Sequence, residues 1–358
     1  MKGIIFLVSL ISILGLLTIY SSTYLFFGKA IFFRQLIWLV ISFFLLLVLS
    51  RFNYQRFWDI GWPLYILSIL LLVVVLILGS PKLGAKRWLQ IYQLNFQPSE
   101  LVKFSLVVLL SRYYSRKSIG DLTGVFKSTD FFYSLILPFS FILIPFILIL
   151  MQPDLGTAVI LLIAFIGILF VKKVKPVYIF GFILSLILFS PFFFFLLKDY
   201  QKQRLLVFLN PNYDPLGTGY TVIQSKVAIG AGRVFGKGWF SGTQSQLNFL
   251  PAAYTDFIFA SFAEEWGFLG CVILIFFFYQ LMNKIFLVGE KITEPFGKLI
   301  SYGILFLISS QVIINICMSL GLLPVVGIPL PFFSYGGSHL LINFISMGVL
   351  LNISKRLT

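Results

Sequence analysis

Asp256 is the residue in this chain whose type and position most clearly suggest chemistry. It lies where a long polar loop meets an apolar helix, within residues 250–259. An ionisable group beside lipid is costly and is therefore a candidate functional residue. Thr255 is predicted to cap the helix, which puts Asp256 in the first turn, where the helix dipole favours the ionised form. Such a carboxylate can act as a general base towards a hydroxyl group, or it can serve simply as a second cap.

Further acidic residues follow on the same predicted helix. Asp256, Ala260 and Glu264 are four residues apart and would share one helix face. Glu264 would then lie about 12 Å deeper than Asp256, at 1.5 Å per residue. We interpret Glu264 and Glu265 as structural partners for basic residues rather than as catalytic groups.

An ion pair is predicted at the start of the apolar segment 99–113. Pro98 suits the first helical position, and Glu100 and Lys103 are three residues apart, which allows them to pair on one face. Inside a membrane such a pair either stabilises the fold or lines a polar cavity. The sequence leaves both interpretations open.

Asp154 lies in a predicted tight hairpin, within residues 151–157. It can cap the helix that follows, or it can face the same cavity as Glu100 and Lys103. We favour the structural role.

Lys86, Arg87 and Trp88 form a short basic and aromatic cluster. Charge-assisted hydrogen bonds from the two cations suit a diphosphate, and the indole face suits a sugar ring beside it. The alternative is an interfacial aromatic belt with flanking cations, and the sequence favours neither.

Two stretches rich in small residues are less specific. Residues 230–238 contain four glycines but fail as a P-loop, because Ala231 stands where the first glycine belongs and Gly238 replaces the Ser or Thr. They indicate only flexible backbone near a membrane-surface substrate. Residues 329–338 predict a broken entry to the last apolar segment, and non-helical backbone at membrane depth lines a cavity or packs within protein.

The elements that carry these residues are predicted to be membrane-spanning helices. Of 358 residues, 59% are hydrophobic and only 11% charged, with a mean hydropathy of +1.01, whereas a soluble domain carries roughly 25% charged residues. The apolar runs are continuous, which favours helices over a barrel. We predict an all-α integral membrane protein, one polytopic domain over 1–358, with its first span retained rather than cleaved. The ten predicted spans are 4–22, 31–50, 60–79, 99–113, 132–150, 155–171, 177–197, 256–284, 298–320 and 337–353.

The distribution of basic residues predicts the orientation. An even number of spans puts both termini on one side, and the segments on that side hold 15 of the 27 Lys and Arg residues, against five in the short loops opposite. The positive-inside rule therefore places both termini in the cytoplasm. Topology thus explains the net charge of +15, and we expect no nucleic acid partner.

The loop 198–255 is predicted to lie outside the cell and to be functional, since it is long but too apolar and aromatic for disorder. Residues 221–229 within it predict an interfacial or half-inserted helix. Cys271 and Cys317 fall in apolar runs and are interpreted as buried thiols. The single histidine, His339, argues against a His-based metal cluster or a Ser-His-Asp triad.

These stretches together resemble the SEDS family (shape, elongation, division and sporulation proteins). The match is to several short motifs in family order, and ten spans is the family's architecture. The stretch 242–246 and the short N-terminal tail resemble the RodA branch, which serves elongation, more than the FtsW division branch. The matching segments are Gly84–Trp88, Gln97–Glu100, Gln152–Thr157, Gly242–Gln246, Thr255–Ala260, and Gly321–Pro324 through Pro329–Ser338.

The resemblance implies a peptidoglycan glycosyltransferase that polymerises lipid II at the outer face of the bacterial cytoplasmic membrane. Undecaprenyl diphosphate would leave with inversion of the sugar linkage. Asp256 aligns with the family's essential aspartate and Trp88 with its important tryptophan, while Glu100, Lys103 and Asp154 match its central cavity. Implied partners are a class B penicillin-binding protein, other elongation-complex membrane proteins and membrane lipids. Candidate groups for the leaving diphosphate are Lys86, Arg87, Lys103, Arg204 and Arg233, with a divalent cation (Mg²⁺ or Mn²⁺) as an open option.

Three departures from the family pattern limit what can be carried over. The family's Pro-Glu-x-His-Thr-Asp reads Pro251-Ala252-Ala253-Tyr254-Thr255-Asp256 here, so neither the Glu nor the His is required. His339 replaces the second Ser of a Gly-Gly-Ser-Ser turn, and Arg233 replaces a small residue. None removes the core carboxylate.

Two other classes of function stay open at this point. A lipid II flippase would suit the polytopic topology and the charges at Glu100, Lys103 and Glu264, but only one clear broken helix entry is found where a transporter usually has a pair. A scaffold for a penicillin-binding protein would not need Asp256 at all.

Overall fold

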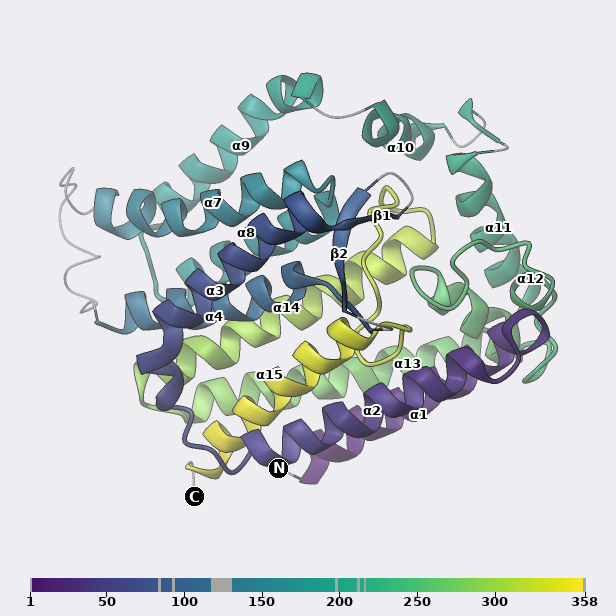
Figure 1. The fold of residues 1–358 in the computed structure, drawn as a ribbon, viewed down its shortest axis with the longest axis horizontal. Coiled ribbons are helices and arrows are strands. Elements are labelled where there is room, and N and C mark those ends of the chain that lie inside the picture. The colour runs from purple at the N-terminus through teal and green to yellow at the C-terminus, as the bar shows by residue number, and fades with distance from the viewer. Residues whose placement is uncertain are drawn as a thin grey trace. The chain divides into compact units, whose positions relative to one another are not determined.

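A helix occupies each of the ten predicted segments in the computed structural model, which describes residues 2–82, 85–91, 94–116, 131–196, 199–210, 213–215 and 217–356 (Figure 1). Gly84, Lys117 and Lys127, which entered the motif and charge arguments, lie outside these residues. The ten helical segments are α1 (Lys2–Phe27), α2 (Ala30–Leu49), α3 (Arg56–Leu78), α4 (Pro98–Arg116), η1 (Phe132–Ile136) continuing into α7 (Leu137–Met151), α8 (Leu155–Val171), α9 (Pro176–Leu196), α13 (Ile258–Lys291), α14 (Pro295–Ser319) and α15 (Gly337–Lys355).

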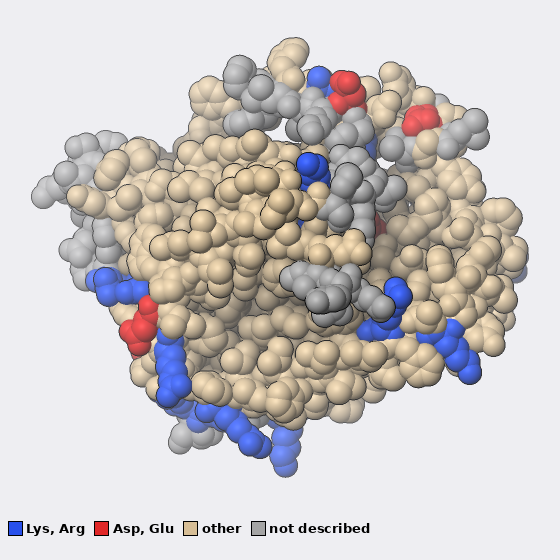
Figure 2. Space-filling view, viewed as in Figure 1, with Lys and Arg blue, Asp and Glu red and all other residues tan. Residues whose placement is uncertain are grey.

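Seven helices in the described part of the chain are long and apolar enough to cross a membrane. Helix α8 and the part of α9 over 176–191 are apolar but shorter, and α4 carries the charges of Glu100, Lys103 and two arginines. Charged side chains cover little of the face drawn in Figure 2. The chain is therefore a multi-pass helical membrane protein, while the count of ten crossings and the side of the termini stay predictions.

Two compact units are built from segments that alternate along the chain. Unit 1 comprises Met1–Val48, Asp199–Lys284 and Ile308–Gly348, and unit 2 comprises Leu49–Lys198, Ile285–Leu307 and Val349–Thr358. Helices α13, α14 and α15 each contribute residues to both units. The prediction of one membrane domain over 1–358 is not tested by this division.

The core of unit 2 is formed by α3, α4, α7 and α8, which lie side by side in Figure 1, together with Tyr178, Ile179 and Phe182 of α9. Tyr114 and Phe165 are among its fully buried side chains. The hydroxyls of Ser68 and Ser105 hydrogen-bond at 2.8 Å between α3 and α4, which satisfies two polar groups that would be costly to bury alone.

A small antiparallel sheet in unit 2 was not predicted from the sequence. It consists of β1 (Ser80–Lys82), β2 (Ala85–Ile91) and β3 (Leu94–Phe96), in that order. Ser80 is opposite Trp88, and Gln90 is opposite Asn95. Strand β2 contacts both α3 and α4, so the sheet fixes the Lys86–Trp88 cluster to the helices of this unit.

The long loop 198–255 is largely helical, and this confirms the prediction of a helix over 221–229. It contains α10 (Asp199–Leu209), α11 (Thr218–Ala231) and α12 (Thr243–Gln246), all in unit 1. Ala228 of α11 packs with Leu250, Ala253, Phe257 and Ala260 in a buried apolar cluster. This cluster anchors the end of the loop against the start of α13.

Candidate functional site

Asp256 lies in a turn, not in a helix. Helix α13 begins at Ile258, and the Thr255 hydroxyl donates to the Ala252 carbonyl at 3.3 Å. The prediction that Thr255 caps the helix and that Asp256 occupies its first turn is therefore wrong, as is a single helix face shared by Asp256 and Glu264. The reason is local: Ala252 adopts φ +54°, and its carbonyl accepts the amides of Thr255 and Phe257, which closes a turn instead of starting the helix.

Three consecutive carbonyls in this turn accept hydrogen bonds from residues 315–335. The amide of Tyr335 donates to Tyr254 O at 3.0 Å, and the hydroxyl of Ser334 donates to Thr255 O at 2.7 Å. Nδ2 of Asn315 donates to Asp256 O at 2.8 Å. Irregular backbone packed inside a protein needs partners for its polar groups, and these bonds supply them.

The segment 329–338 packs within protein, which is one of the two predicted roles. The Ser334 hydroxyl also accepts the Leu330 amide at 2.8 Å. Gln35 of α2 donates to Ser334 O at 3.3 Å and accepts the Gly336 amide at 3.2 Å. Sequence reasoning missed Gln35 and Asn315, although a polar residue inside an apolar span is itself a signal of function or of a structural hydrogen bond.

The carboxylate of Asp256 lies against Gly327. A β-carbon at position 327 would be 3.4 Å from Asp256 Oδ2, and Gly327 has φ +71°, a conformation that favours glycine. Asp256 itself is partly buried. The glycine thus leaves the surface beneath the carboxylate free of a side chain.

Tyr254 replaces the histidine of the family pattern and acts as a packing residue. Its ring lies 5.7 Å from that of Tyr335 and 6.0 Å from that of Phe27, measured between centroids. Burial, with a smaller contribution from Tyr335, raises the pKa of Tyr254 above its usual value. The phenol therefore stays protonated near neutral pH, and Asp256 carries the one carboxylate of residues 251–257.

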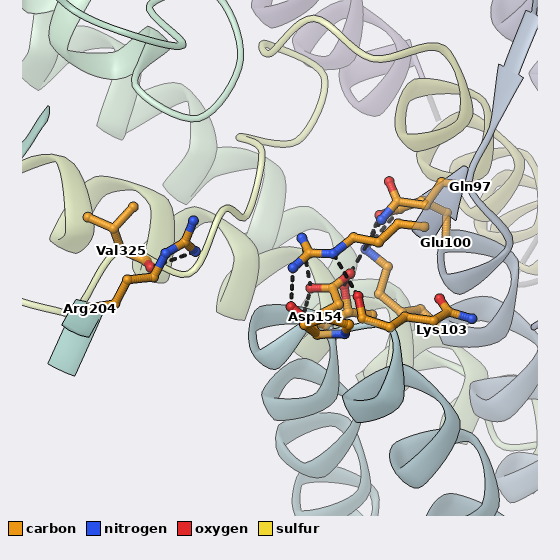
Figure 3. A network of polar contacts seen from close by, with 10 residues as sticks. Gln97, Glu100, Lys103, Asp154, Arg204 and Val325 are labelled. Carbon is orange, nitrogen blue, oxygen red and sulfur yellow. Dashed lines mark hydrogen bonds and ion pairs between the residues drawn. The ribbon is translucent and has the colours of Figure 1, made fainter. Parts of the chain in front are cut away.

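Arg204 of α10 is held to the segment that precedes 329–338. Its Nη1 donates to Val325 O at 3.1 Å (Figure 3), and Val325 packs on the apolar cluster that includes Phe257. Arg204 and Asp256 are thus both attached to residues 315–335 within unit 1.

Asp154 caps α8, and its carboxylate lies close to several hydrogen-bond donors of unit 2. It accepts from the Thr157 amide at 3.2 Å and the Thr157 hydroxyl at 2.9 Å, which confirms the predicted cap. Gln97 Nε2 lies 3.4 Å from Oδ2 (Figure 3). Arg87 Nη1 lies 3.9 Å from Oδ1.

Arg87 is engaged with the backbone of the 152–154 hairpin. Its Nε donates to Gln152 O at 3.0 Å, and its Nη2 donates to Pro153 O. The pairing of β2 with β1 shifts between Lys86, opposite Pro81, and Trp88, opposite Ser80, so Arg87 is the extra residue of a bulge and the regular alternation of faces is broken there. Lys86 is exposed and Trp88 is partly exposed, which leaves these two side chains accessible to a ligand.

Glu100 and Lys103 form the predicted ion pair. Lys103 Nζ lies 2.8 Å from Glu100 Oε2 and 2.9 Å from Oε1, and both side chains are only 3% exposed. A pair this buried is costly to place unless its geometry is good, and both carboxylate oxygens are within reach of the ammonium group.

Glu264 has the predicted structural role. It is fully buried and accepts from Lys237 Nζ at 2.7 Å and Thr243 Oγ1 at 3.0 Å, and from the Gln244 amide at 3.1 Å. Its neighbour Glu265 accepts from Ser21 of α1. The two glutamates therefore tie the long loop and α1 to α13.

The glycines of 230–238 serve backbone pairing with α13. The amides of Lys237 and Gly238 donate to the carbonyls of Glu264 and Glu265, both at 3.0 Å. A β-carbon on Gly236 would be 2.1 Å from Glu265 O, so only glycine permits this approach. This supplies a packing explanation where the sequence suggested only flexibility.

Arg233 is not brought near Asp256 by these contacts. Its carbonyl accepts the Phe268 amide at 2.9 Å, and Phe268 lies ten residues after Ile258, beyond the non-helical Gly267 that interrupts α13. Arg233 has φ +48°, a conformation that favours glycine. The predicted site residues divide between unit 1 (Asp256, Arg204 and Arg233) and unit 2 (Lys86, Arg87, Trp88, Glu100, Lys103 and Asp154).

In the described part of the chain, no three His, Cys, Asp or Glu residues form a group able to hold a metal ion. A bound metal ion would therefore need further ligand atoms from the substrate. Mg²⁺ is often bound by one or two carboxylates together with substrate phosphates. Asp256 is the partly buried carboxylate whose surroundings would allow such sharing.

The fold and these polar sites define a multi-pass helical membrane protein that keeps a partly buried carboxylate in a non-helical turn. Along its whole length, residues 1–358, the chain matches the family model of cell cycle proteins that covers FtsW, RodA and SpoVE. The chain belongs to this family.

Named relatives include both branches. The chain is 40% identical to peptidoglycan glycosyltransferase MrdB of Escherichia coli K12 over 296 residues, 82% of this chain and 78% of the relative. It is 37% identical to a probable peptidoglycan glycosyltransferase FtsW of Trichlorobacter lovleyi, over 90% of this chain and 83% of the relative.

Two solved structures have the same fold. One chain, from work on the structural coordination of polymerization and crosslinking by a peptidoglycan synthase complex, superimposes with a TM-score of 0.84 at 29% identity, covering 100% of this chain and 98% of that one. Thermus thermophilus Rod shape determining protein RodA, in a variant with one aspartate replaced by alanine, gives 0.74 at 27% identity, covering 99% and 97%.

Proposed function

We propose that this protein is a peptidoglycan glycosyltransferase that polymerises lipid II into glycan strands for cell elongation. The observation that carries the proposal is Asp256, a partly buried carboxylate whose turn is fixed by hydrogen bonds to three consecutive carbonyls. Family membership and relatives named peptidoglycan glycosyltransferase support the same activity. The 40% identity to MrdB and the stretch 242–246 favour the elongation branch over division.

The reaction follows from a single in-line displacement. The 4-hydroxyl of a lipid II sugar attacks the anomeric carbon of the growing lipid-linked chain, and Asp256 takes the hydroxyl proton as the new C–O bond forms. The bond from the anomeric carbon to the diphosphate oxygen breaks, undecaprenyl diphosphate leaves with the electron pair, and the α linkage becomes β.

Cations are required where negative charge develops on the leaving diphosphate. Lys86 is exposed and Trp88 is partly exposed on β2, and these two suit a diphosphate and its sugar. Arg204, Lys103 and Arg233 are further candidates, as is a divalent cation held jointly with the phosphates. Arg87 is engaged with Gln152 O and Pro153 O, so its role in the proposal is to position β2. Glu100 and Asp154 are the proposed acidic substrate-binding residues of unit 2.

The proposed setting is the bacterial cytoplasmic membrane, crossed ten times with both termini in the cytoplasm. The excess of Lys and Arg in the segments on the side of the termini supports this orientation. It places Asp256 and the loop 198–255 on the outer face, where lipid II would be polymerised.

The proposed partner is a class B penicillin-binding protein that cross-links the new strands. Its support is the similarity to a chain from a peptidoglycan synthase complex described by its polymerization and crosslinking. Other membrane proteins of an elongation complex, and membrane lipids, are further expected partners.

The test is glycan polymerisation by the purified protein with labelled lipid II as the only substrate, with and without a class B penicillin-binding protein. Wild type is expected to form polymer and Asp256→Asn to form none while remaining folded. Asp59→Asn is the matched control, because Asp59 is an exposed carboxylate of α3. Polymer from Asp256→Asn at the wild-type rate would remove the base assignment. Transfer of lipid II across liposomes without any polymer would identify a flippase instead.

A further inference from the structure

The turn that carries Asp256 depends on outside contacts for its shape. It lies between α12 and α13 and has no helical hydrogen-bond ladder, and the Ala252 carbonyl supplies its internal bonds. The tethers from residues 315–335 therefore decide where the carboxylate is held. Among them, the side chain of Asn315 bonds to the Asp256 residue itself.

Asn315 uses both hydrogens of its amide group on backbone carbonyls. Nδ2 donates to Asp256 O at 2.8 Å and to Ile328 O at 2.7 Å. Carbonyl oxygens only accept, so the nitrogen and not the oxygen of this amide must face them. The side chain is fully buried, and its Oδ1 has no donor among the residues that the structure describes. Its hydrogen bonding is therefore devoted to these two carbonyls.

The two carbonyls lie on two backbone segments that meet at the Asp256 carboxylate. Asp256 O is the backbone of the residue that carries the carboxylate. Ile328 follows Gly327, the residue against which Asp256 Oδ2 lies. One amide thus fixes both the backbone that carries the carboxylate and the backbone beneath it.

The Asn315 side chain extends from a regular helix. Asn315 lies within α14, near its end at Ser319, and the Ser319 hydroxyl donates to Asn315 O at 2.9 Å. A catalytic group that is built on irregular backbone needs such support, since a displacement of about 1 Å can cost on the order of 100-fold in rate.

We propose that Asn315 is a positioning residue for Asp256, holding its turn and the Gly327–Ile328 backbone in register for proton transfer. The inference rests on the proposed function, because it concerns the same carboxylate. In this proposal Asn315 does not contact the substrate.

The experiment compares Asn315→Leu with wild type in two measurements. Leucine keeps the branched shape of the side chain, with two methyl groups in place of the amide oxygen and nitrogen, and removes both donors. The first measurement is polymerisation kinetics, where kcat is expected to fall 10- to 100-fold with KM for lipid II changed less than threefold. The second is hydrogen exchange, where the amides of Thr255, Phe257, Leu330 and Tyr335 are expected to exchange at least tenfold faster while the rest of unit 1 is unchanged.

The matched control is Asn343→Leu, since Asn343 is also a buried asparagine of unit 1 and its amide lies 3.1 Å from a ring nitrogen of His339. It is expected to keep wild-type kcat and wild-type exchange at the four amides. If Asn315→Leu does not fold, Asn315→Ser, which keeps one hydroxyl donor, takes its place with smaller effects in the same direction.

The outcomes separate this inference from the proposed function. Unchanged exchange at the four amides, or exchange that rises equally throughout unit 1, would overturn the positioning role whatever the activity. Retention of more than half the wild-type kcat in a folded variant would overturn it as well. Absence of polymer from wild type would overturn the proposed function, and the exchange measurement would still decide whether Asn315 holds the turn.

Discussion

Arg87 donates to the Gln152 carbonyl at 3.0 Å, so the guanidinium is part of the support for β2 and the 152–154 hairpin. The neighbouring Lys86 is exposed instead. The two cations, adjacent in sequence, are therefore expected to give different phenotypes when substituted.

Lys86→Gln is predicted to weaken substrate binding, because it removes a charge-assisted bond to phosphate. KM for lipid II is expected to rise at least fivefold with little change in thermal stability. Arg87→Lys is expected to lower the melting temperature, because an ammonium group cannot reproduce the fork of donors towards two carbonyls. Steady-state kinetics and thermal unfolding in detergent measure both, with Lys29→Gln, an exposed lysine, as control. Equal KM values for Lys86→Gln and wild type would exclude phosphate binding by Lys86.

The Glu100–Lys103 pair is predicted to give a strongly non-additive double-mutant cycle. Removing one partner leaves a buried charge uncompensated, which costs about 3–5 kcal/mol, so Glu100→Gln and Lys103→Met should each lower stability markedly. The double variant is expected to recover most of that loss. Thermal unfolding measures the cycle, and additive losses would contradict it.

Polymerisation by the same double variant decides between the two interpretations that the sequence left open. Activity close to wild type would make the pair structural. A stable but inactive protein would place it in the substrate site, where charge is needed for function rather than for folding.

The helices of this protein could be predicted from sequence because their signal is dominated by hydropathy. Each continuous apolar run became a helix, and the Glu100–Lys103 pair and the Asp154 cap followed from spacings of three residues along regular helix. Such features depend on neighbours in the sequence, which composition and periodicity report directly.

The parts that could not be predicted depend on contacts between distant residues. The turn around Asp256 is set by Asn315 and Ser334, which are 59 and 79 residues away in sequence. The small sheet around Trp88 has strands of three to seven residues, too short for a periodicity signal. The requirement for glycine at position 236 likewise depends on the close approach of the Glu265 carbonyl, a contact between residues distant in sequence.

Tyr54 is predicted to make stability depend on pH in the alkaline range. Burial, followed by the charge of Glu294 and the hydrogen bond that Tyr54 donates to it, raises the pKa of Tyr54 to about 12 from an ordinary value of 10. The folded state therefore retains the proton more tightly than the unfolded state. The stabilisation that the Tyr54 hydroxyl contributes to the folded state is fully present below pH 10 and is lost as the pH rises from 10 through 12.

Melting temperature measured from pH 8 to pH 12 tests this, with Tyr54→Phe as the comparison because it removes the titrating hydroxyl. The difference between wild type and variant is expected to shrink above pH 10. A difference that stays constant over this range would show that Tyr54 does not titrate differently in the two states.

Gly327→Ala is predicted to impair catalysis more than folding. Its φ of +71° is strained for alanine, and the new methyl group would meet Asp256 Oδ2 at 3.4 Å, an ordinary contact that covers one side of the carboxylate. The strain costs roughly 1 kcal/mol, which a membrane protein of ordinary stability tolerates. We expect kcat to fall at least tenfold while the protein stays folded. Gly28→Ala is the matched control, since Gly28 has φ +55° with nothing within 4 Å of its β-position. An equal loss of activity in both variants would assign the effect to backbone strain, whereas loss in Gly327→Ala alone would assign it to the space beside Asp256.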